Sequence, residues 1–224
     1  MRTVYLGFVA AFLIMAAGFW PTTFGAKHPL DALHMVHGSL AATWMAMLVA
    51  QSWLAGRWRL RWHRRIGWAS VAIVPALVVS SLLVVRYELA FSTYFSRDLR
   101  LTLTWLDLWS LVAFCGLWGA AIAYRRRWPL HARYVGSTVF IVLPPALGRL
   151  LGGPFGSLAP ALPPTYVIIV IAVAGLLVRD VVKGGHPLPY ALTLLALVVP
   201  AVTMFAAPGW PWFVRAVEAV APIG

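Results

Sequence analysis

The sequence predicts an all-α fold, a polytopic transmembrane helix bundle of about seven spans, on two observations. First, 62% of its 224 residues are hydrophobic and only 11% are charged, whereas soluble domains carry about 25% charged residues. Second, the apolar residues form long runs separated by short basic gaps. The composition excludes an ordinary soluble protein, and the amount of apolar surface excludes a disordered chain.

Each predicted span is an apolar run close to the roughly 20 residues that a helix needs to cross the hydrocarbon core. The runs cover residues 4–20, 32–55, 66–85, 101–124, 134–152, 165–178 and 190–206. The sixth run is short, so it either extends back through Ala161-Leu162-Pro163-Pro164 or tilts less; a bundle of six spans is the alternative to seven. None of the runs alternates polar and apolar residues as barrel strands do.

Basic residues predict how the spans are oriented. They follow the second, fourth and sixth runs, and cytoplasmic loops are enriched in Lys and Arg. These residues are Arg57, Arg59, Arg61, Arg64 and Arg65, then Arg125, Arg126, Arg127 and Arg133, then Arg179 and Lys183. With Arg2, they predict a cytoplasmic N-terminus and, for seven spans, an outer C-terminus, in the cytoplasmic (inner) membrane of a bacterial-type cell.

The net charge of +12 is therefore explained by the basic loops that orient the spans in the membrane. No nucleic-acid partner is expected. The expected partners are the bilayer itself and anionic lipid at the Arg-rich loops. Cys115 is the only cysteine, which excludes an intrachain disulfide.

We interpret residues 1–224 as a single integral membrane domain. The first run resembles a signal peptide, but it is long enough to span and no small-x-small cleavage site ends it, so we expect a retained helix.

Residues 207–224 are expected to be an interfacial tail, because Trp210 and Trp212 suit the headgroup level and Pro208 and Pro211 interrupt a span. Gly116 and Gly119 are expected to allow close helix contact.

Two stretches within residues 30–152 resemble each other. Each stretch opens a span after an Arg- and Trp-rich loop, and each span then carries a proline. The two stretches are Trp62-His63-Arg64-Arg65-Ile66-Gly67 and Leu130-His131-Ala132-Arg133-Tyr134-Val135-Gly136. Two related helical hairpins, formed by spans two and three and by spans four and five, explain this pattern. Repeats of this kind often build sites near the membrane midplane.

Ionisable residues inside spans indicate function by default. Asp107 lies in the fourth run, with Thr104 and Ser110 on the same helix face, and Arg149 lies near the end of the fifth. Their simplest interpretation is an intramembrane ion pair that locks two helices together. The alternative is a charged site on a solute path.

The histidines are the candidate cofactor ligands. His34 and His37, with Asp107, would form a metal site for copper or zinc; alternatively, His34, His37, His63 and His131 would hold haem b or a quinone. The structural alternatives are helix-start residues for His34 and His37, and loop-end residues beside arginine for His63 and His131. Phosphate-loop, G-x-S-x-G, H-E-x-x-H and Cys-pair motifs are absent. A hydrolase or kinase would need groups that this chain lacks, whereas membrane enzymes that use only His, Asp and Arg remain open.

The motifs of residues 30–152 resemble an uncharacterised family of bacterial predicted multi-pass membrane proteins. The resemblance rests on His34-Met35-Val36-His37-Gly38, Gln51, His63-Arg64-Arg65-Ile66-Gly67-Trp68, His131-Ala132-Arg133 and Gly148-Arg149-Leu150. The chain is less similar to transmembrane b-type cytochromes of the ferric-reductase kind, which would imply haem between histidines.

The sequence leaves three functions open. The first is a redox protein that binds haem, a transition metal or a quinone through histidines on spans two, three and five. The second is a carrier or channel for a small solute or ion, with Asp107 and Arg149 on its path. The third is a non-catalytic accessory subunit of a larger membrane complex.

Overall fold

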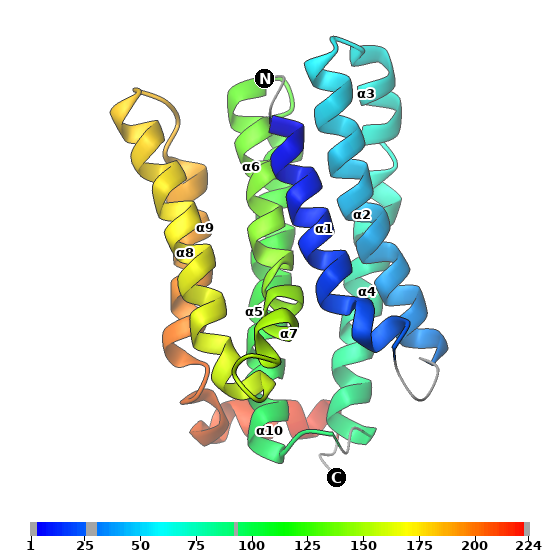
Figure 1. Cartoon of the computed structure of the whole chain (residues 1–224), viewed down its shortest axis with the longest axis vertical. Coiled ribbons are helices and arrows are strands. Elements are labelled where there is room, and N and C mark those ends of the chain that lie inside the picture. The colour runs from blue at the N-terminus through cyan, green and yellow to red at the C-terminus, as the bar shows by residue number, and fades with distance from the viewer. Residues whose placement is uncertain (1–3, 26–30, 92–93, 222–224) are drawn as a thin grey trace. The chain divides into compact units, whose positions relative to one another are not determined.

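The computed structural model describes residues 4–25, 31–91 and 94–221, and all the regular structure in these ranges is helical (Figure 1). The helices are α1 (Val4–Thr23), α2 (Ala32–Gly56), α3 (Leu60–Gly67), α4 (Ser70–Phe91), α5 (Arg97–Ala123), α6 (Trp128–Val142), α7 (Pro144–Gly152), α8 (Leu158–Val182), α9 (Leu188–Thr203), the 3-10 turn η1 (Ala207–Gly209) and α10 (Pro211–Val220). The predicted all-helical fold is confirmed.

Within the described part of the chain, six stretches of helix are long and apolar enough to cross a membrane, as a multi-pass membrane protein requires. They are α1, α2, the consecutive pair α3 and α4, α5, the consecutive pair α6 and α7, and α8. The seventh candidate, α9, has only 16 residues. The count of seven spans is therefore not confirmed by helix length.

The chain divides into two compact units, residues 1–84 (unit 1) and residues 85–224 (unit 2), and the boundary falls within α4. In unit 1, α1 packs against α2, and α3 folds back on the end of α2. The backbone N–H of Arg59 bonds to the Leu54 carbonyl at 2.9 Å across this turn. Trp58 takes a positive φ of 59° there, a conformation that bulky residues rarely adopt.

In unit 2, α5 packs against α6 and α9, and α8 packs against α7 and α9. Buried hydroxyl residues occur inside this bundle, including Thr138, Thr165 and Thr193. Each donates its hydroxyl to a carbonyl of its own helix, at 2.7 Å in all three cases. Because the hydroxyls are satisfied within one helix, they can be buried without a partner from another helix.

Among the residues described in unit 2, no close contact is seen at Gly116 or Gly119: a Cβ atom at either position would meet nothing within 4 Å. A glycine that does lie in a contact between two helices is Gly148 of α7. A Cβ atom there would come within 3.3 Å of Leu158 and 3.6 Å of Thr165. Gly148 therefore allows α7 to lie close to α8, one residue before Arg149.

Four of the six spans begin earlier than the sequence boundaries placed them: the third at Leu60, the fourth at Arg97, the fifth at Trp128 and the sixth at Leu158. The fourth span begins at Arg97, because Ser96 caps α5 by accepting a bond from the Leu99 N–H at 3.4 Å. The sixth begins at Leu158 and contains Pro163 and Pro164, so it extends back as the longer alternative expected. Pro144 separates α6 from α7, whereas Pro75 lies inside an uninterrupted α4.

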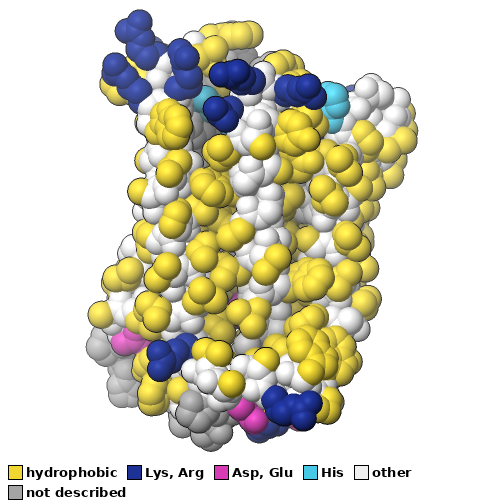
Figure 2. Space-filling model, turned by 180° about the vertical axis from the view of Figure 1, so that it is seen from behind, with side chains coloured by type: hydrophobic (Ala, Val, Ile, Leu, Met, Phe, Trp, Pro, Cys, Tyr) yellow, Lys and Arg dark blue, Asp and Glu magenta, His cyan; other side chains and the backbone are white. Residues whose placement is uncertain are grey.

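The interfacial tail contains η1 and α10, which runs across the helix ends of unit 2 (Figure 1). Phe213 and Val217 of α10 are buried against Leu89 and Leu101. On the face seen in Figure 2, hydrophobic side chains cover the lengths of the helices, and Lys and Arg side chains lie at their ends. This distribution suits helices surrounded by lipid.

Candidate functional site

The candidate site that brings together the most ionisable and hydroxyl side chains lies in unit 2, around Asp107. This residue is the eleventh of α5, so it lies about 15 Å along the helix from its first residue. The early start of α5 therefore puts Asp107 deeper in its span than the sequence boundary implied. Its side chain is exposed, while Thr104, one turn earlier, is buried.

Charges from two other helices act on Asp107. Arg149, in the last turn of α7, attracts its carboxylate, and Glu88, near the end of α4, repels it. The Arg149 guanidinium donates to the Pro145 carbonyl at 3.0 Å, which orients it along its own helix. The electrostatic interaction expected between Asp107 and Arg149 is present, and the direct ion pair stays a prediction.

Two hydroxyl groups complete this set. Tyr166 of α8 is buried, and its hydroxyl shares a hydrogen bond with Ser110, one turn along α5 from Asp107. The negative charge of Asp107 also acts on Tyr166. We call Glu88, Asp107, Ser110, Arg149 and Tyr166 the Asp107 cluster. It combines two acids, one base and two hydroxyls, so it can interact with either sign of charge and can exchange protons.

His34 and His37 each have a partner within unit 1. The Asp31 carboxylate caps α2, with one oxygen accepting from the His34 N–H at 3.0 Å and the other 2.7 Å from His34 Nδ1. The backbone bond from His34 is the main reason that the pKa of Asp31 is lowered. His37 Nδ1 lies 3.1 Å from the Ser80 hydroxyl of α4. The hydrogen bonds of His34 are those of a helix-start residue, and His37 links two helices.

His63 and His131 make matching contacts in the two units. His63 Nδ1 lies 3.2 Å from the Gln51 carbonyl, and His131 Nδ1 lies 2.8 Å from the Ala121 carbonyl. Both carbonyls belong to the end of the preceding helix. A carbonyl only accepts hydrogen bonds, so each Nδ1 carries the proton. Each histidine thus ties the start of one helix to the end of the helix before it, as the sequence repeat implies.

The same contacts bear on cofactor binding. A proton on Nδ1 leaves Nε2 as the nitrogen that would bind haem iron or a metal ion. Within the described residues, no group of three or more His, Cys, Asp or Glu could hold a metal ion. The predicted metal set draws His34 and His37 from unit 1 and Asp107 from unit 2, and it gains no support here.

An ion pair that the sequence analysis missed joins α6 to the end of α8. Arg133 donates to both carboxylate oxygens of Asp180, through Nε and through Nη2 at 3.1 Å, and its Nη1 donates to the Pro129 carbonyl at 2.9 Å. Asp180 also accepts from the His186 N–H. Its side chain is only 4% exposed. The signal available was a single acidic residue among the basic residues that follow the sixth run.

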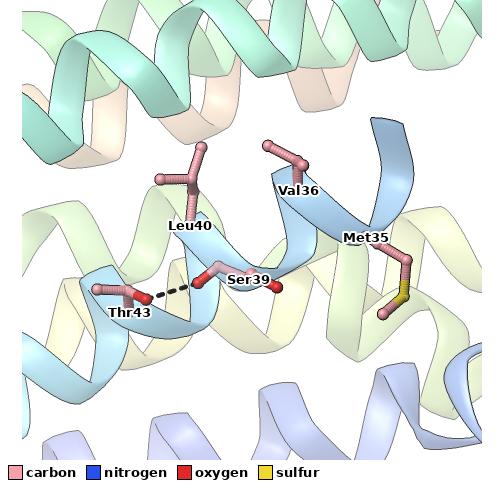
Figure 3. Close-up of a pocket in the computed structure, with 5 residues that line it drawn as sticks. All are labelled: Met35, Val36, Ser39, Leu40 and Thr43. Carbon is pink, nitrogen blue, oxygen red and sulfur yellow. Dashed lines mark hydrogen bonds between the residues drawn. The ribbon is translucent and has the colours of Figure 1, made fainter. Parts of the chain in front are cut away.

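A shallow hollow occurs on one face of α2, a turn beyond His34. Met35, Val36, Ser39, Leu40 and Thr43 line it (Figure 3), and the Thr43 hydroxyl donates to the Ser39 carbonyl at 2.7 Å. The lining has no titratable side chain, so this hollow offers no acid–base chemistry. No protein-family model, curated protein or solved structure matches the chain.

Proposed function

We propose that the chain is a carrier or channel for a small polar solute or ion, and that the Asp107 cluster of unit 2 lines its path. The observation that supports this is an exposed carboxylate in the middle of an apolar helix, beside Arg149, Glu88 and two hydroxyls. A charge at the centre of a spanning helix costs about 2.5–3.5 kcal/mol. Ionisable residues within spanning helices mark substrate and ion pathways and are by default a hypothesis for a functional site.

The proposal includes a cytoplasmic-membrane location with the N-terminus inside. Its support is the distribution of basic residues between helices: Arg125–Arg127 follow α5, and Arg179 and Lys183 lie at the end of α8. We also count α9 as a seventh span. It packs along α5, α6 and α8, and its 16 residues extend about 24 Å, a deficit that bilayer thinning can accommodate.

The test is flux into proteoliposomes, with one labelled probe for each kind of charge: sodium, chloride and glycine. We expect one of them to enter faster than into empty liposomes, and Asp107→Asn to reduce that rate at least tenfold. Asp98→Asn is the matched control, because Asp98 is an exposed residue in the first turn of the same helix. Absence of flux for all three probes would contradict the proposal.

The redox function remains the second candidate, favoured by one observation. His63 and His131 both carry the Nδ1 proton and direct it to a backbone carbonyl, the arrangement that orients histidine ligands of metals and haem. The visible spectrum of the purified protein, oxidised and then reduced with dithionite, tests it. A Soret band that is lost in His63→Ala and His131→Ala would support haem binding; a colourless protein that retains no haem when supplied with it would exclude this candidate.

A further inference from the structure

The helix α3 of unit 1 has two opposite faces. His63 and Gly67 face α2: the His63 ring and the Gln51 carbonyl are bonded at 3.2 Å, and the Gln51 amide donates to the His63 carbonyl at 2.9 Å. A Cβ atom on Gly67 would lie 3.2 Å from the same amide. These contacts fix the rotation of α3 about its axis.

The opposite face of α3 carries Arg61, Arg64 and Arg65, followed by Trp68. Their spacing of three, four and seven residues places them on one side of a helix, and all four are exposed. Like charges at this spacing repel and destabilise a helix. An anion bound across the three guanidinium groups would remove this repulsion.

The anion is not supplied by unit 1. Asp31 is the only acidic residue in the sequence of residues 1–84, and it caps the start of α2, a 25-residue helix. Its distance along α2 from the turn into α3 is about 37 Å. Unit 1 therefore supplies no carboxylate near the arginine face, and an anionic partner bound there would come from outside this unit.

The position of α3 relative to the bilayer identifies that partner. Residues 60–91 form 32 residues of nearly continuous helix, about 48 Å long, whereas the hydrocarbon core is about 30 Å thick. The Arg-rich end therefore extends into the headgroup layer. The exposed Trp58, Trp62 and Trp68 suit the same level, since tryptophans concentrate at membrane–water interfaces.

A hollow at the same end of unit 1 adds room for a ligand. Tyr5 of α1 and Trp53, Gly56 and Arg57 at the end of α2 line it. The Arg57 guanidinium lies over the Trp53 ring, 5.3 Å from its centroid, and Arg65 lies over Trp62 at 5.4 Å. These cation–π contacts hold two guanidinium groups in place at the helix surface.

We propose that the exposed face of α3, formed by Arg61, Arg64, Arg65 and Trp68, is a binding site for the phosphate headgroup of an anionic phospholipid. Guanidinium groups bind phosphate oxygens in pairs, and the tryptophan lies beside the glycerol and upper acyl region. This site is independent of the Asp107 cluster. The proposal places the lipid contact on α3 and not on the other basic segments of the chain.

The test measures lipid retained by the full-length protein in native mass spectrometry, with phosphatidylglycerol and phosphatidylcholine supplied in equal amounts. The triple variant Arg61→Gln/Arg64→Gln/Arg65→Gln is compared with Arg125→Gln/Arg126→Gln/Arg127→Gln, which removes the same charge from another exposed basic segment. We expect about 100-fold weaker phosphatidylglycerol binding in the first variant, since each basic residue near an anionic surface contributes about fivefold. The second variant should lose clearly less, because Arg125–Arg127 lie in the turn between α5 and α6 and do not share one helix face.

Further variants keep the proposal falsifiable if the triple variant does not fold. Arg64→Gln alone should weaken binding several-fold, and Arg61→Lys/Arg64→Lys/Arg65→Lys should retain most of it while preserving the charge. Millimolar inorganic phosphate should not displace the lipid. Equal losses in both triple variants, equal retention of the two lipids, or displacement by phosphate would overturn the proposal.

Discussion

Arg133 and Asp180 show how a single pair of residues can connect three segments of unit 2. Their ion pair joins α6 to α8, and the His186 N–H adds the chain that leads into α9. A Cβ atom on Gly185 would lie 3.0 Å from the Asp180 carboxyl carbon. Because the Asp180 carboxylate is enclosed, we expect the stability of the fold to depend on its ion pair with Arg133.

Asp180→Asn should lower the free energy of unfolding by about 3 kcal/mol, because removing one partner of a buried ion pair leaves the other charge uncompensated. Arg179→Gln is the control: Arg179 is half exposed and contacts the same carboxylate at 3.6 Å, so its loss should cost under about 1 kcal/mol. Thermal unfolding in detergent compares the two. Equal shifts in Tm would show that the Arg133 contact is not the stabilising one.

Asp31 gives a pH-dependent prediction. The backbone bond from His34 lowers the pKa of Asp31 below its usual 3.8, so the charged cap stabilises the folded state above about pH 4. That stability is lost as the pH falls through the folded-state pKa. The difference in Tm between the native chain and Asp31→Asn should therefore shrink below pH 4. A difference that stays constant from pH 6 to pH 3 would contradict this role of the charge.

At the scale of elements, α10 is held to unit 2 by apolar packing and by one surface ion pair. Phe213 is buried beside Leu89 and Leu101, and Trp105 packs edge-on against Phe213 at 5.4 Å. The ion pair, between Arg97 and Glu218 at 2.8 Å, is nearly half exposed on both sides. Packing is therefore expected to dominate the attachment.

Phe213→Ala should destabilise the attachment of α10 by about 3 kcal/mol, through lost burial and the cavity that remains. Glu218→Gln should change it by under about 1 kcal/mol. Limited proteolysis of the C-terminal segment measures the attachment directly. Faster cleavage in Glu218→Gln than in Phe213→Ala would reverse this ranking.

Element boundaries show what sequence patterns can and cannot predict. Apolar runs located the spanning helices, because a helix in lipid must be apolar over most of its length. The charged first turn hid the start of α5, because Arg97, Asp98 and Arg100 resembled a loop, whereas the extension of α8 back through Pro163 and Pro164 was one of the expected alternatives. The Ser96 cap that begins α5 is not visible in a hydropathy pattern.

The candidate site was predictable only where one helix was enough to identify it. Asp107 and Ser110 share a face of α5, so their spacing indicated a polar stripe. Tyr166 and Glu88 come from other helices, and Asp180 pairs with Arg133 across 47 positions. Contacts of that separation depend on how the helices pack, which one sequence does not specify.

At the scale of the whole molecule, the proposed topology gives a labelling prediction. In a Cys115→Ala background, Arg126→Cys should react with a membrane-impermeant maleimide only from the cytoplasmic side, and Phe155→Cys only from the outer side. Both positions are exposed, and they lie at opposite ends of the α6–α7 stretch. Reaction of both cysteines from the same side would contradict the topology.

The central claim is that Asp107 lines a solute path, and the comparison of Asp107→Asn with Asp98→Asn tests it most directly. Both changes remove one carboxylate from α5, nine positions apart, so the change in net charge is matched. The expected result is at least tenfold slower uptake of the transported probe for Asp107→Asn, with native uptake for Asp98→Asn and unchanged Tm for both. Native uptake by Asp107→Asn would contradict the claim.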